Sequence, residues 1–164
     1  MDGYAARMRT LLTRTNISRT LAVIGCLVLT FGLFLPWFIL GWGQSYPDVT
    51  GLDVYWYGAN LEKLMIVLTV LLWIFVLANK PLPAIVAGAF LFIMMLYVFM
   101  DRQNILGIVL ENKYAIDCLV GCPDRPLALG PYVSVTGVIL AMATEFVVWR
   151  GRNVRADTKP ETDS

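Results

Sequence analysis

Four long apolar stretches limit the fold of this chain more than any other feature of its sequence. They are residues 20–42, 64–79, 82–100 and 131–149. About 20 helical residues cross the apolar core of a bilayer, and Glu145 is the only charged residue in the four stretches. The sequence therefore predicts an all-α protein, a single four-helix transmembrane bundle over residues 1–152, followed by a polar tail over residues 153–164.

The composition argues against most catalytic and metal-binding functions. Hydrophobic residues make up 58% of the 164 residues and charged residues only 15%. A soluble domain of this size would need a larger share of polar residues to cover its surface. Histidine is absent, so the commonest metal ligand and the commonest general base are both missing. We expect no catalytic residue, no metal site and no cofactor, although methionine and cysteine are still available as ligands. A net charge of +1 without a strongly basic segment indicates no nucleic-acid partner.

The distribution of basic residues predicts the topology. Nine of the thirteen lie in the two terminal segments and the turn at residues 80–83, whereas four lie in segments 43–63 and 101–130 beside seven acidic residues. Basic residues are retained on the cytoplasmic side of membranes. We therefore expect a bacterial inner-membrane protein with both termini in the cytoplasm and a small extracytoplasmic cap. Glu145 then lies near the cytoplasmic headgroups, where we expect an ion pair with Arg150 or an arginine of the tail.

Proline and apolar spacing predict how the stretches are joined. The run Lys80-Pro81-Leu82-Pro83 favours a tight antiparallel hairpin of the second and third helices, and Pro36 is expected to kink or end the first helix. In the cap, residues 51–60 suit a short strand or a surface loop. Residues 104–116 suit a short amphipathic helix or an extension of the third helix.

Small residues predict how closely the helices pack. They recur at helical spacing, as Ala84 with Gly88, Gly137 with Ala141, and Gly25 with Gly32. Such pairs allow helix backbones to approach closely in lipid. We therefore expect them at helix–helix contacts, either within the bundle or with another protein.

Tryptophans cluster near the predicted membrane boundaries. Trp37, Trp42 and Trp56 lie near the outer boundary and Trp149 lies near the inner one. Tryptophan is enriched at membrane interfaces, so we interpret all four as interfacial anchors. The alternative is an aromatic platform for a quinone or a carotenoid.

Two cysteines lie close together in the second outer segment. They form the run Cys118-Leu-Val-Gly-Cys122-Pro, on the side of the membrane where disulfides persist. We favour a structural disulfide between Cys118 and Cys122, and the alternative is a redox-active pair. Cys26, inside the first helix, is interpreted as a small packing residue.

Two resemblances accompany these patterns. The run Leu35-Pro36-Trp37 at the end of the first helix and the run Leu129-Gly130-Pro131-Tyr132 before the fourth resemble those of small four-helix bacterial membrane proteins without an assigned function. The topology with an outer cysteine pair resembles the disulfide-generating quinone reductases of bacterial membranes. Those enzymes carry a second cysteine pair in the first outer segment, and segment 43–63 has none, so the resemblance implies no catalytic role here.

These observations favour a non-catalytic role. The leading hypothesis is an accessory or structural subunit of a larger bacterial membrane complex, in respiration, photosynthesis or envelope transport. Its motivation is that the helices lack ionisable groups and a ligand set, while the outer segments are long enough to dock a partner. The alternative is a membrane thiol–quinone oxidoreductase that uses Cys118 and Cys122.

Overall fold

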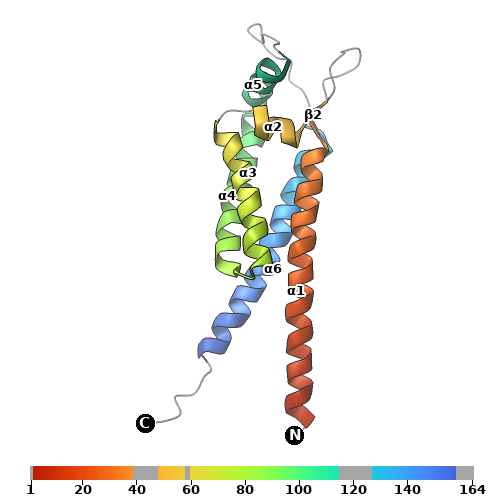
Figure 1. The fold of residues 1–164 in the computed structure, drawn as a ribbon, viewed down its shortest axis with the longest axis vertical. Helices are drawn as coiled ribbons and strands as arrows, with labels where there is room; N and C mark the ends of the chain where they lie inside the picture. Colours follow the sequence, from red (N-terminus) through yellow and green to blue (C-terminus); the bar gives the residue numbers. More distant parts are fainter. Residues whose placement is uncertain (1, 39–47, 58–59, 115–126, 158–164) are drawn as a thin grey trace.

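The protein is almost entirely helical in the computed structural model, which describes residues 2–38, 48–57, 60–114 and 127–157 (Figure 1). The long helices are α1 (Asp2–Phe34), α3 (Asn60–Leu77), α4 (Pro81–Met100) and α6 (Leu129–Asp157). The short elements are α2 (Gly51–Tyr57), α5 (Arg102–Tyr114) and the antiparallel strands β1 (Pro36–Phe38) and β2 (Val49–Thr50). The predicted all-α class is confirmed.

Three helical segments are long and apolar enough to cross a membrane. They are Asn16–Phe34, Pro81–Met100 and Leu129–Asn153. A fourth apolar segment, Lys63–Leu77, is shorter. The described part of the chain therefore has three helices that could cross a membrane, whereas the fourth crossing stays a prediction.

Two of the long helices have ends that differ from the expected ones. The structure ends α1 at Phe34, well before the predicted residue 42, because Pro36 has no amide hydrogen to continue a helix and starts β1 instead. Helix α6 continues to Asp157, past the expected tail boundary at residue 152. Hydropathy marks the point where the chain leaves an apolar surrounding. Both differences arise because a helix can end before that point, as α1 does, or continue past it, as α6 does.

Helices α3 and α4 form the predicted antiparallel hairpin, lying side by side in Figure 1. The turn between them contains Asn79 with a φ of 57°, and asparagine tolerates this left-handed conformation better than most residues. The amide of Lys80 donates to the carbonyl of Phe75 at 2.9 Å, and Pro81 then begins α4. Pro81 suits this position because the first turn of a helix does not use its amide hydrogens.

Helix α6 lies between α1 and the α3–α4 hairpin and packs against both (Figure 1). Its contact with α1 is made by small residues, because a Cβ atom built on Gly25 would lie 2.6 Å from the amide nitrogen of Ala141 and 2.9 Å from the carbonyl oxygen of Gly137. On the other side, a Cβ atom on Gly88 of α4 would meet Met142 of α6. The small-residue pairs are thus used for packing inside the bundle.

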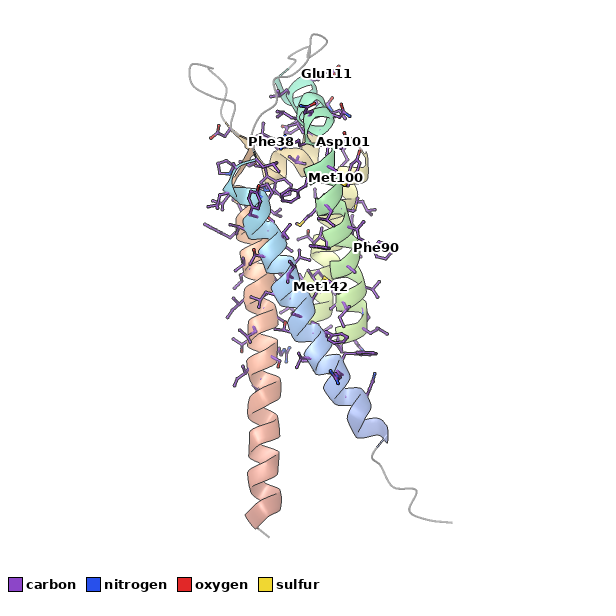
Figure 2. All side chains as sticks on the ribbon, turned by 180° about the vertical axis from the view of Figure 1, so that it is seen from behind. Phe38, Phe90, Met100, Asp101, Glu111 and Met142 are labelled. Carbon is purple, nitrogen blue, oxygen red and sulfur yellow. The ribbon has the colours of Figure 1, made fainter. Side chains whose placement is uncertain are left out.

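The apolar side chains divide into a buried set and an exposed set. Leu29, Leu72, Leu91 and Met95 are fully buried between the helices. Large apolar side chains on the outward faces remain exposed, and Phe90, 58% exposed, points away from the bundle in Figure 2. Exposed apolar faces of this extent suit an apolar surrounding such as lipid acyl chains.

Candidate functional site

Trp37 organises the outer end of the bundle. Only 1% of its surface is exposed, and its indole Nε1 donates a hydrogen bond to the carbonyl of Gly32 at 3.0 Å. The carbonyl of Trp37 accepts a hydrogen bond from the amide of Ala128 at 3.0 Å. The structure therefore places Trp37 in the protein interior, whereas an interfacial anchor exposes its ring to the headgroup region.

Two glycines allow the indole of Trp37 to lie against the backbone. A Cβ atom on Gly51, the first residue of α2, would lie 2.6 Å from Cε2 of Trp37. A Cβ atom on Gly130, near the start of α6, would meet Cδ1 of Trp37 and lie 2.7 Å from the carbonyl oxygen of Pro36. The two sequence runs that carry the family resemblance therefore meet here, and Gly32, Trp37, Gly51 and Gly130 form what we call the Trp37 cluster.

Helix α2 is held at its start by a reciprocal cap. The carboxylate Oδ2 of Asp53 accepts hydrogen bonds from the amide and the hydroxyl of Thr50, each at 2.9 Å. The amide of Asp53 in turn donates to the hydroxyl of Thr50 at 3.4 Å. This arrangement resembles a capping box, with Asp in place of the usual Glu. Residues 51–57 are therefore helical, and the expectation of a strand or a loop over 51–60 is wrong for this part.

Helix α5 is a separate helix at the tip of the cap. Asp101 separates it from α4. Of the two alternatives for residues 104–116, the structure therefore has the short separate helix as far as Tyr114, and residues 115–116 lie outside the described residues. The side-chain amide of Asn112 donates to the carbonyl of Tyr57 at 2.7 Å, which ties α5 to α2. Strand β1 also bridges to Leu127 through Phe38, so the cap is linked to α1, α2 and α6.

The inner end is organised around the α3–α4 turn. Nη2 of Arg19, on α1, donates to the carbonyl of Leu77 at 2.9 Å. Arg152, on α6, donates from Nη1 to the carbonyl of Asn79 at 3.2 Å and from Nη2 to its side-chain oxygen at 2.6 Å. Two arginines from different helices thus bind the end of α3, where carbonyl groups have no partner within the helix.

Glu145 lies inside the bundle and not at its surface. Its side chain is 3% exposed, and its Oε2 atom makes no hydrogen bond within the described part of the chain. Arg152 and Arg19 interact with it electrostatically. The expected ion pair with Arg150 or an arginine of the tail is therefore wrong in its surface location, because Glu145 is buried. Of these arginines, Arg152 interacts with it electrostatically.

The remaining predicted site residues have varied surroundings. Trp56 is 69% exposed, and the ring of Trp149 lies 5.8 Å from that of Phe146 between centroids, so the anchor role of both stays a prediction. Cys118, Cys122 and Trp42 lie outside the described residues. The disulfide and the thiol–quinone alternative therefore also stay predictions.

The described residues offer little ligand chemistry. Among them, no group of three or more His, Cys, Asp or Glu side chains could hold a metal ion. Comparison with known protein families, curated proteins and solved structures finds no match for this chain. Two groups of polar contacts lie at the ends of the bundle, namely the Trp37 cluster with the α2 cap and the arginines at the α3–α4 turn.

Proposed function

We propose that this protein is a non-catalytic accessory subunit of a larger bacterial membrane protein complex, of the respiratory, photosynthetic or envelope-transport kind. The observation that carries the proposal is the built cap at the outer end. A short helix, α5, projects beyond the bundle (Figure 1) and is joined to α2 through Asn112 and Tyr57. A rigid polar projection on an apolar bundle is suited to docking another protein.

The surface of α5 supports docking. Its exposed side chains are polar or charged, namely Gln103, Asn104, Glu111 and Asn112. Its apolar side chains Ile105, Leu106 and Val109 are buried against the protein. The polar face is therefore presented on a helix whose orientation is held by its own packing, which lowers the entropy cost of binding.

The bundle itself supports a structural role. Most of its buried groups are apolar, and its closest contacts, at Gly25 and Gly137, are backbone packing. Glu145 is the one charged group that the described residues bury, whereas pumps and proton relays use chains of such groups.

The proposed orientation has both termini in the cytoplasm of a bacterial cell, with four helices crossing the inner membrane. Arg19, Lys80 and Arg152 belong to the inner end, in agreement with the retention of basic residues on the cytoplasmic side. Helix α3, with 18 residues, is about 27 Å long at 1.5 Å per residue. That length is close to the ~30 Å apolar core of a bilayer, and α3 runs along the whole of α4 (Figure 1).

Site-directed photo-crosslinking in native membranes tests the proposal. A photoreactive residue at Glu111, on the exposed face of α5, is expected to give one adduct of defined larger mass (Figure 2). The same probe at Phe90, on an outward apolar face, is the matched control and is expected to give lipid adducts. Blue-native electrophoresis of mildly solubilised membranes should then show comigration with the crosslinked partner. Migration only as a monomer or homo-oligomer, with no adduct from Glu111, would overturn the accessory role.

A further inference from the structure

Basic side chains from three separate parts of the chain gather at the inner end. Arg19 and Arg152 bind the carbonyls of Leu77 and Asn79, and Lys80 is the next residue along the same turn. All three basic side chains are exposed. We call Arg19, Lys80 and Arg152 the inner-end site.

The positive charges of this site are not balanced by the contacts that hold it. Each acceptor of the two arginines is a neutral oxygen, of a backbone carbonyl or of the Asn79 amide. A guanidinium has five N–H donors, and Arg19 uses one of them and Arg152 two in the described part of the chain. Both side chains are therefore held in place while donors remain for an anion.

An acid that interacts with both arginines is buried. Glu145 interacts electrostatically with Arg152 and Arg19, yet its Oε2 atom makes no hydrogen bond in the described ranges. It can offset at most one of the three positive charges. The exposed side of the inner-end site thus keeps an excess of positive charge.

Apolar side chains next to the site indicate which anion it suits. Leu77 and Leu82 flank the turn and are 53% and 54% exposed. A ligand that touches both the basic residues and these leucines needs an anionic head and an apolar body. Basic groups placed between helices at a membrane surface bind anionic lipid headgroups, and guanidinium matches phosphate in a bidentate geometry.

We propose that the inner-end site binds the phosphate of an anionic phospholipid, whose acyl chains lie along the exposed leucines of the α3–α4 hairpin. The lipid would then link α1, α6 and the hairpin at the end where α1 and α6 diverge (Figure 1). This inference does not depend on the accessory role, and it holds whichever leaflet the inner end faces.

The test uses the purified full chain in detergent, titrated with phosphatidylglycerol or with phosphatidylcholine of the same acyl chains. Lipid retention is counted by native mass spectrometry, and the melting temperature is followed by circular dichroism. The anionic lipid is expected to be retained and to raise the melting temperature, and phosphatidylcholine is not. Each basic residue is expected to contribute about fivefold in affinity. Lys80→Gln should therefore weaken binding about fivefold, and Arg19→Gln combined with Arg152→Gln should weaken it about twenty-fivefold.

Arg150→Gln is the matched control. Arg150 is exposed on α6 near the same end, and no contact within the described ranges holds its side chain beside the turn. Its loss should therefore leave affinity within about twofold. If the double arginine variant does not fold, Lys80→Gln alone tests the proposal. The Lys80 side chain makes no hydrogen bond to another helix in the described ranges, so its loss should not unfold the protein. Equal losses for Arg150→Gln and Lys80→Gln would mean diffuse attraction and overturn the proposal. So would equal retention of the two lipids, or a melting shift reproduced by inorganic phosphate alone.

Discussion

Replacing Trp37 with alanine is expected to destabilise the protein more than removing any other tryptophan whose surroundings are described. The indole is 1% exposed, lies against Gly51 and Gly130, and donates to the carbonyl of Gly32. Its removal opens a cavity where the ends of α1, α2 and α6 meet. The backbone around it is tied at Ala128, so the cavity can close only in part.

The magnitude follows from the buried area. A fully buried tryptophan removes roughly 200 Å² from water, which at about 25 cal/mol per Å² is worth about 5 kcal/mol. The lost hydrogen bond adds about 1 kcal/mol, because the carbonyl of Gly32 is left without its donor. Partial relaxation reduces the sum, and buried Trp→Ala changes cost about 3–5 kcal/mol in practice. Trp37→Phe keeps most of the ring and should cost about 1–2 kcal/mol.

The measurement is reversible unfolding in mixed micelles with increasing SDS, followed by far-ultraviolet circular dichroism. Trp56→Ala is the matched control, because Trp56 is 69% exposed and its loss should change the free energy of unfolding by less than about 1 kcal/mol. Hydrogen exchange of residues 49–57 shows whether the loss is local to the cap. A difference between Trp37→Ala and Trp56→Ala below about 1 kcal/mol would refute the central packing role of Trp37.

Three further substitutions probe the packing, the cap and the buried acid. Gly137→Val should cost about 2 kcal/mol in the same unfolding assay, because α1 must move away from α6. The control Gly151→Val, with open space around the residue, should cost under about 0.5 kcal/mol. Equal effects of the two substitutions would contradict the close approach of α1 and α6. Thr50→Ala removes the hydroxyl that bonds to the carboxylate and the amide of Asp53. It should remove about 1 kcal/mol of capping and speed hydrogen exchange in α2 about fivefold, and unchanged exchange would contradict the cap. Glu145→Met should leave the melting temperature unchanged or higher, because the carboxylate is buried with Oε2 unbonded; a clear fall would show that attraction to Arg19 and Arg152 exceeds the cost of burial.

The helices and their pairing follow from local signals in the sequence. Hydropathy locates all four long helices, the prolines at 81 and 83 predict the hairpin, and the small residues predict close packing. Hydropathy alone predicts too long a first helix, because apolar residues continue past Pro36 into β1, whereas the expectation that Pro36 kinks or ends the helix is confirmed. Thr50-x-x-Asp53 is a cap signal that is present in the sequence and predicts the start of α2.

The two ends of the bundle depend on contacts that no local pattern encodes. Trp37 near a membrane boundary looks like an anchor, because nothing around it in the sequence shows that Gly51 and Gly130 will lie against its ring. Glu145 next to Arg150 looks like half of a surface ion pair. Its burial depends on how α6 passes α1 and the hairpin, which is decided by packing along the whole helix.

The contact between α1 and α6 has a consequence for biogenesis. Helix α1 leaves the ribosome before α6, and these two helices make the most extensive contact in the bundle. The indole of Trp37 also lies against Gly130 near the start of α6. Until α6 is synthesised, α1 therefore lacks the helix that it packs against most, and Trp37 lacks its contact with Gly130. The bundle can therefore close only after α6 has been synthesised. A nascent chain that stalls before α6 exposes the face of α1 around Gly25 to the membrane insertion machinery.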